Sequence, residues 1–170
     1  MNDIISLIAN LALTLSLIVG VIFGIAQVRA AARDRKERLT LESLRHFQTR
    51  EFSELMYFII YQSFPTSEKE LRKRPAKEQV FYLHFAQEME SLGILVAERL
   101  IDIDLVDKTL GSFVMTAWSK YKTMFDDIRQ KQSDPFLGEY FQWLSERIEE
   151  RMREQPRKPF YHTSSKRWRK

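Results

Sequence analysis

The sequence predicts an all-α protein in which one N-terminal transmembrane helix continues into a small cytoplasmic helical bundle. Residues 4–26 carry no charge, apolar residues recur with helical spacing along the rest of the chain, and only five glycines and five prolines interrupt 170 residues. No segment alternates between apolar and polar residues for long enough to indicate a β-strand. We therefore expect a transmembrane anchor over residues 1–28, a cytoplasmic helical domain over 29–154 and a basic, disordered tail over 155–170.

The uncharged segment 4–26 is long enough to cross a membrane. As a helix it measures about 35 Å, against about 30 Å for the hydrocarbon core of a bilayer. A cleaved signal peptide is the alternative, but the first three residues contain no Lys or Arg and the apolar stretch is too long. A buried helix of a soluble protein seldom runs this far without a charge.

The charges on either side of this segment predict its orientation. Only Asp3 precedes it, whereas five basic residues follow closely: Arg29, Arg33, Arg35, Lys36 and Arg38. Because positive charge is retained in the cytoplasm, we expect the N-terminus outside and the rest of the chain in the cytoplasm.

The first helix is expected to continue past Arg29, because the residues up to Arg45 are good helix formers. Leu41, Leu44 and Phe47 would begin an apolar face. Residues 50–62 predict a second helix, and residues 67–70 have capping-box spacing, which predicts a short helical turn.

Three longer helices are expected to complete the domain. One runs from about residue 75 to 100 and is apolar nearly all round, which is typical of a central helix. Asp102 is expected to cap a helix over 103–131, and Pro135 to occupy the first position of the last helix, over 135–154. The residues expected to face inward from the last two helices are Ile103, Val106, Leu110, Phe113, Ala117, Tyr121, Met124, Ile128, Leu137, Phe141, Leu144 and Ile148.

Small residues recur every four positions in the transmembrane segment, at Ala12, Ser16, Gly20 and Gly24. Such spacing lets two helix backbones approach closely. We therefore expect a homo-oligomer or a pairing with another membrane protein. The alternative is that glycine is simply frequent in membrane helices.

Few residues offer catalytic or metal-binding chemistry. The chain has no cysteine and three histidines, and it lacks a phosphate-binding glycine-rich loop and a nucleophile elbow. Asp102 and Asp104 have the spacing of a divalent-metal motif, but a helix start explains them as caps. His84 and Glu88 lie four apart with no third ligand, so we expect Glu88 to be a buried acid paired with an arginine. No enzyme activity, metal or other cofactor is predicted.

The tail carries six basic residues and no acidic residue. It can contact anionic lipid, remain an inert end or bind nucleic acid, and lipid is favoured because the anchor keeps the tail near a bilayer. The residues expected to bind lipid or another polyanion are Arg29, Arg33, Arg35, Lys36, Arg38, Arg157, Lys158, Lys166, Arg167, Trp168, Arg169 and Lys170.

Several segments carry a resemblance to a known family: ESLGILV at 90–96, LIDIDLV at 100–106, Ala117-Trp118, and YFQWL at 140–144. With Gly111, they resemble an uncharacterised bacterial family of small single-span membrane proteins with a helical cytoplasmic domain. The resemblance implies a bacterial inner-membrane location and carries over no activity and no catalytic residue.

These observations together predict a membrane-anchored interaction or scaffold protein, for example the membrane component of a multi-protein assembly such as a stress or phage-defence system. A tethered nucleic-acid-binding protein that uses the basic tail is the first alternative. An enzyme with a carboxylate metal site, such as a hydrolase, is the second.

Overall fold

The computed structural model describes residues 2–157 and 159 of the chain, and no strand occurs among them. The all-α prediction is therefore confirmed, including a long apolar helix at the N-terminus. The helices of the described residues are α1 Asn2–His46, α2 Arg50–Tyr61, α3 Glu68–Arg72, α4 Ala76–Ala97, α5 Ile103–Gln132 and α6 Glu139–Glu154.

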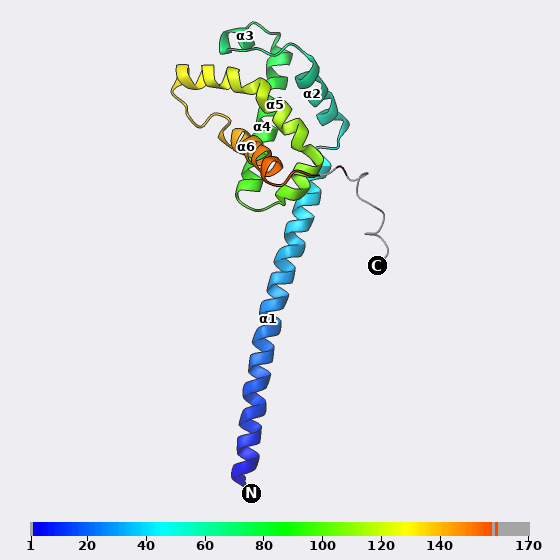
Figure 1. Cartoon of the computed structure of the whole chain (residues 1–170), viewed down its shortest axis with the longest axis vertical. Helices are drawn as coiled ribbons and strands as arrows, with labels where there is room; N and C mark the ends of the chain where they lie inside the picture. Colours follow the sequence, from blue (N-terminus) through cyan, green and yellow to red (C-terminus); the bar gives the residue numbers. More distant parts are fainter. Residues whose placement is uncertain (1, 158, 160–170) are drawn as a thin grey trace.

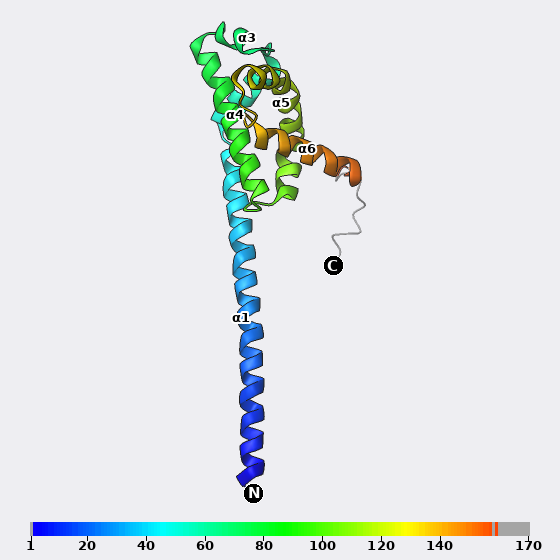
Figure 2. The ribbon, with the colours of Figure 1, turned by 90° about the vertical axis from the view of Figure 1, so that its left-hand side faces the viewer.

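Helix α1 is a single unbroken helix of 45 residues, about 68 Å long. Its C-terminal end packs into a bundle formed with α2–α6, and the rest extends away from the bundle (Figure 1, Figure 2). No residue from Ile4 to Leu39 is buried. This helix is long and apolar enough to span a membrane.

The packing of α1 against the bundle begins at Thr40, which is fully buried. Its Oγ1 accepts a hydrogen bond from the Asp102 amide at 2.9 Å and donates one to the Lys36 carbonyl at 2.8 Å. Leu44 and Phe47 are buried as predicted, but Leu41 is 56% exposed. Positions 40 and 44 share one face of α1, and Phe47 follows directly after its last residue. Position 41 lies about 80° away from that face, which explains the wrong prediction for Leu41.

The core is built around an aromatic cluster between α4, α5 and α6. Phe85 stacks on Tyr121 with ring centroids 5.9 Å apart, and Phe141 packs edge-on to Tyr121 at 5.5 Å. The Tyr121 hydroxyl donates to the Tyr82 carbonyl at 2.7 Å. Helix α4 packs against both α2 and α6, whereas Leu83 and Ile94 on its remaining side are 57% and 40% exposed.

Helices α4 and α6 approach each other closely at Gly93. A Cβ atom at this position would lie 2.3 Å from the Tyr140 carbonyl oxygen. One turn earlier, the two carboxylate oxygens of Glu90 accept hydrogen bonds from the Tyr140 and Phe141 amides at 3.2 and 2.9 Å. Glu90 therefore caps the start of α6 from a neighbouring helix.

The predicted start of the last helix at Pro135 is wrong. Helix α5 ends at Gln132, the next residue, Ser133, has a left-handed conformation, residues 135–138 form turns, and α6 begins only at Glu139. Gly138 has φ +67°, and the Phe125 ring occupies the space that a Cβ at position 138 would need. The first turn of α6 thus forms where Glu90 caps it.

Most of the predicted inward-facing residues of α5 and α6 are buried, with three differences. Phe113 is 41% exposed, and Val114, at 1%, takes its place. The buried positions follow the spacing 110, 114, 117 and 121, and position 113 lies about 70° from the centre of this face. Ile103 and Leu137 pack only partly against the core.

Candidate functional site

The most distinctive surface of the molecule is the apolar segment of α1, residues 4–28. Its large apolar side chains from Ile4 to Val28 are each 49–70% exposed. The Thr14 hydroxyl donates to the Asn10 carbonyl at 2.8 Å, so this polar side chain is satisfied inside the helix, as required in a bilayer.

The small residues Ala12, Ser16, Gly20 and Gly24 all lie on this exposed segment. A Cβ built at Gly20 or at Gly24 would meet no atom within 4 Å. The four positions therefore form a continuous, uncovered stripe, which leaves room for the backbone of a neighbouring helix.

Five basic residues encircle α1 between the apolar segment and the bundle, and we call them the basic collar: Arg29, Arg33, Arg35, Lys36 and Arg38. Positions 29, 33 and 36 share one side of the helix, and 35 and 38 lie on other sides. Of the collar, Lys36 is partly exposed and the others are exposed. Arg33 pairs with Glu37 at 2.9 Å. The collar spans about 15 Å of helix that no other described element covers.

Arg157 is the one predicted tail residue whose side chain the structure describes, since Lys158, Lys166, Arg167, Trp168, Arg169 and Lys170 lie outside the described residues. Its guanidinium lies 3.2 Å from the Asp107 carboxylate and donates to the Asp107 carbonyl at 3.3 Å. The start of the tail is therefore tied to the bundle.

Asp107 itself was not predicted as a site residue. It is 6% exposed, and Gly111, one turn later, leaves room for its carboxylate, because a Cβ there would lie 2.5 Å from Asp107 Oδ1. Its position between the buried residues Val106 and Leu110 was the available signal. A charged residue inside an apolar face needs a partner, and here the partner is Arg157.

The two aspartates of the Asp-x-Asp motif have structural roles. Asp102 caps α5 by accepting a hydrogen bond from the Asp104 amide at 2.7 Å, as predicted. Asp104 pairs with Arg151 of α6. Within the part of the chain that the structure describes, no group of three His, Cys, Asp or Glu residues is arranged to hold a metal ion.

The prediction that Glu88 is a buried acid paired with an arginine is wrong, because its side chain is 19% exposed and its partners are histidines. Its carboxylate meets His46 Nε2 at 2.9 Å and His84 Nε2 at 3.5 Å, rather than an arginine. The last turn of α1 brings His46 against α4. The two residues are 42 positions apart in the sequence, so local spacing could not predict this contact. This pair links the long helix to the bundle.

Burial changes the ionisation of two core tyrosines. It raises the pKa of Tyr121 well above its usual value, and nearby Tyr82 adds to the effect. It also raises the pKa of Tyr82. Both hydroxyls donate to backbone carbonyls. Their raised pKa values therefore accompany core packing.

Comparison with family models matches residues 14–148 to a domain of unknown function, DUF4760. The matched region includes most of the apolar segment, the basic collar and nearly all of the bundle. Comparison with curated proteins and with solved structures gave no match.

Proposed function

The chain belongs to the DUF4760 family, whose function is unknown, and we propose from its own geometry that it is a membrane-anchored interaction protein. The family match confirms the resemblance to an uncharacterised family. A bacterial inner-membrane location, with a single span and the N-terminus outside, is part of the proposal. So is a role as the membrane component of a multi-protein assembly, such as a stress or phage-defence system.

One observation carries the proposal: the apolar segment is wholly exposed, while the bundle buries a core of its own. Soluble monomers rarely expose a continuous apolar surface of this size. A bilayer covers such a surface, and the basic collar next to it favours the cytoplasmic side for the bundle. A reporter that is active only outside the cytoplasm, fused after Lys170, is expected to stay inactive. Activity of this reporter would contradict the orientation.

The stripe of small residues supports pairing with a second copy or with another membrane helix. Because the chain has no cysteine, Ser16→Cys gives a single site for disulfide crosslinking in native membranes. Gly20→Ile and Gly24→Ile are expected to reduce crosslinking, since a branched side chain keeps two backbones apart. Ala26→Ile adds the same kind of bulk about 120° around the helix from Gly20 and about 160° from Gly24, and it serves as the matched control. Equal crosslinking in all three variants would remove this interface.

The basic collar and the tail support contact with anionic lipid. The last turn of α6 lies at the end of the bundle nearer to the apolar segment (Figure 1, Figure 2), so Arg157 starts the tail on that side. Each basic residue near an anionic surface contributes about 1 kcal/mol of binding.

The lipid proposal is tested in nanodiscs with brominated lipids, which quench nearby tryptophan. The full chain is expected to lose more fluorescence than its Trp168→Phe variant, and only when the discs are anionic. Nucleic acid would be favoured instead if the full chain bound oligonucleotides tightly, a chain ending at Pro159 did not, and tryptophan quenching did not depend on lipid charge. This shortened chain keeps Arg157 and its contact with Asp107.

We propose no catalytic role, because the carboxylates of the sequence motifs serve structural bonds. Glu90 caps α6, Asp102 caps α5, and Asp104 and Glu88 pair with basic side chains. Replacing any of them is expected to affect cellular function only as far as it lowers the melting temperature. Loss of function with unchanged melting and unchanged membrane level would favour an enzyme or metal site.

A further inference from the structure

A cavity of about 450 Å³ lies between α3, α4, α5 and the segment that joins α5 to α6. Its deeper wall is formed by buried side chains, among them Leu71, Tyr82, Met124, Phe125 and Ile128. Pockets that hold small molecules have volumes of about 300–1,000 Å³ and mostly apolar walls. The volume equals only about one turn of an α-helix, so a docking helix does not fit inside.

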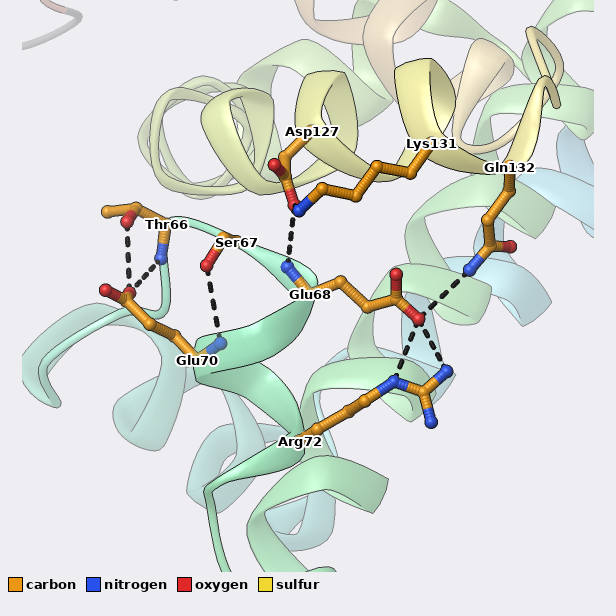
Figure 3. Close-up of polar contacts among 8 residues, drawn as sticks. All are labelled: Thr66, Ser67, Glu68, Glu70, Arg72, Asp127, Lys131 and Gln132. Carbon is orange, nitrogen blue, oxygen red and sulfur yellow. Dashed lines mark hydrogen bonds and ion pairs between the residues drawn. The ribbon is translucent and has the colours of Figure 1, made fainter.

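The charged side chains at the rim of the cavity already have partners within the chain. Glu68 accepts from Arg72 Nε at 2.9 Å and from Gln132 Nε2 at 3.1 Å (Figure 3). Glu90 is occupied by its two hydrogen bonds to α6. The one rim cation, Arg72, is therefore paired with an acid, and an anionic ligand would meet two carboxylates. The cavity suits a neutral ligand.

Helix α3 covers one side of the cavity and places Leu71 in its wall. Polar contacts hold its first residue to α5: the Asp127 carboxylate accepts from the Glu68 amide at 3.0 Å and from Lys131 Nζ at 2.7 Å (Figure 3). The hydrogen bond from Lys131, followed by that from the Glu68 amide, holds the pKa of Asp127 below its usual value. A helix of five residues that buries only one of its side chains, Leu71, opens at low cost in free energy.

We propose that this cavity binds a small, neutral, largely apolar molecule and that α3 is a lid on one side of it. The apolar wall provides the affinity. The paired rim charges provide the preference for neutral over anionic molecules. An anion would either break the pair between Glu68 and Arg72 or be buried without a partner, and both cost free energy. The proposal is independent of membrane anchoring, because all of its residues lie in the bundle.

The absence of cysteine allows a direct test on the full chain in lipid nanodiscs. Ala86→Cys places a thiol in the wall of the cavity, and Ser91→Cys places one on the exposed side of the same helix as the matched control. Both are labelled with a water-soluble, positively charged methanethiosulfonate reagent. The probe is N-phenyl-1-naphthylamine, which is neutral and apolar. It is expected to slow labelling of A86C by about tenfold at saturation, because a bound molecule covers most of such a pocket, and to leave S91C unchanged.

Two further measurements make the result decisive. Dodecanoate, an anionic apolar molecule, is expected to give no protection, and Asp127→Ala is expected to speed labelling of A86C without the probe by loosening α3. Equal slowing of A86C and S91C, or no slowing of either, would overturn the site. Protection by dodecanoate would overturn the neutral class, and an A86C thiol that reacts only after unfolding would overturn the lid. If A86C does not fold, Leu83→Cys at the mouth of the cavity replaces it.

Discussion

Replacing Gly93 by alanine tests how closely α4 and α6 pack. The added methyl group would lie 2.3 Å from the Tyr140 carbonyl oxygen, 2.6 Å from its carbon and 2.9 Å from the Tyr140 Cβ. Ordinary contacts between non-bonded carbon atoms are about 3.5–4.0 Å, so the two helices must separate by about 1 Å. The Tyr140 carbonyl is part of the backbone and cannot move aside as a side chain could, and Glu90 holds the Tyr140 amide in place.

The expected loss follows from two opposing effects. Overpacking in a dense core costs about 1–3 kcal/mol, and a clash with backbone places Gly93→Ala at about the upper end. Alanine regains about 1 kcal/mol of helix propensity. We therefore expect the free energy of unfolding to fall by about 2 kcal/mol and the melting temperature of the bundle by about 10 °C.

The measurement is thermal unfolding of the full chain in micelles, followed by near-UV circular dichroism of the buried aromatic residues. Gly20→Ala makes the same chemical change in open space and is expected to leave the melting temperature unchanged. Gly111→Ala should fall between the two, because its new methyl group meets the Asp107 side chain, which can move. A melting temperature for Gly93→Ala equal to that of Gly20→Ala would refute the close packing of α4 and α6.

Three further outcomes follow from the polar contacts. Arg157→Gln should lower the free energy of unfolding by about 1–2 kcal/mol, because it unpairs the buried Asp107 carboxylate, although the arginine itself is 40% exposed. Adding Asp107→Asn should restore part of the lost stability in urea titrations, and no recovery would contradict the pairing. Because burial raises the pKa of Tyr121 and Tyr82, these tyrosines lose their protons at lower pH in the unfolded chain than in the folded chain. The free energy of unfolding measured in urea should therefore fall as pH rises above about 10, and a constant free energy up to about pH 11.5 would contradict this. The pKa of Asp127 is lowered because its charged carboxylate is hydrogen-bonded in the folded chain. This stabilisation of α3 is present above about pH 4 and is lost as the pH falls further. Protection of the α3 amides from hydrogen exchange should therefore drop in acid, and Asp127→Asn should remove this pH dependence.

The sequence was sufficient for features that depend on neighbouring residues. The cap at Asp102 and the helix around it were predictable, because capping chemistry acts over three or four positions. The start of α6 was not, because Glu90, which caps it, lies 50 residues earlier in the chain. Leu41 and Phe113 show a second limit. The spacing of apolar residues predicts which side of a helix is buried, but residues next to the buried face match the pattern almost as well.

The candidate sites divide in the same way. The stripe of small residues and the basic collar could be predicted, since both are continuous along one exposed helix. The contact between Arg157 and Asp107 joins residues 50 positions apart, and the cavity draws its wall from four separate segments. Neither leaves a pattern at short range, so both required the folded chain.

Because α1 is unbroken, it fixes the side of the helix on which the bundle lies relative to the small residues of the apolar segment. Each residue of an α-helix advances the helix by about 100°. Thr40, which faces the bundle, follows Gly24 by 16 residues and Gly20 by 20, so the two glycines point about 160° and 200° away from it. Two copies that pair through these glycines therefore carry their bundles on opposite outer sides. Two residues inserted into the basic collar would rotate the bundles inward by about 200°.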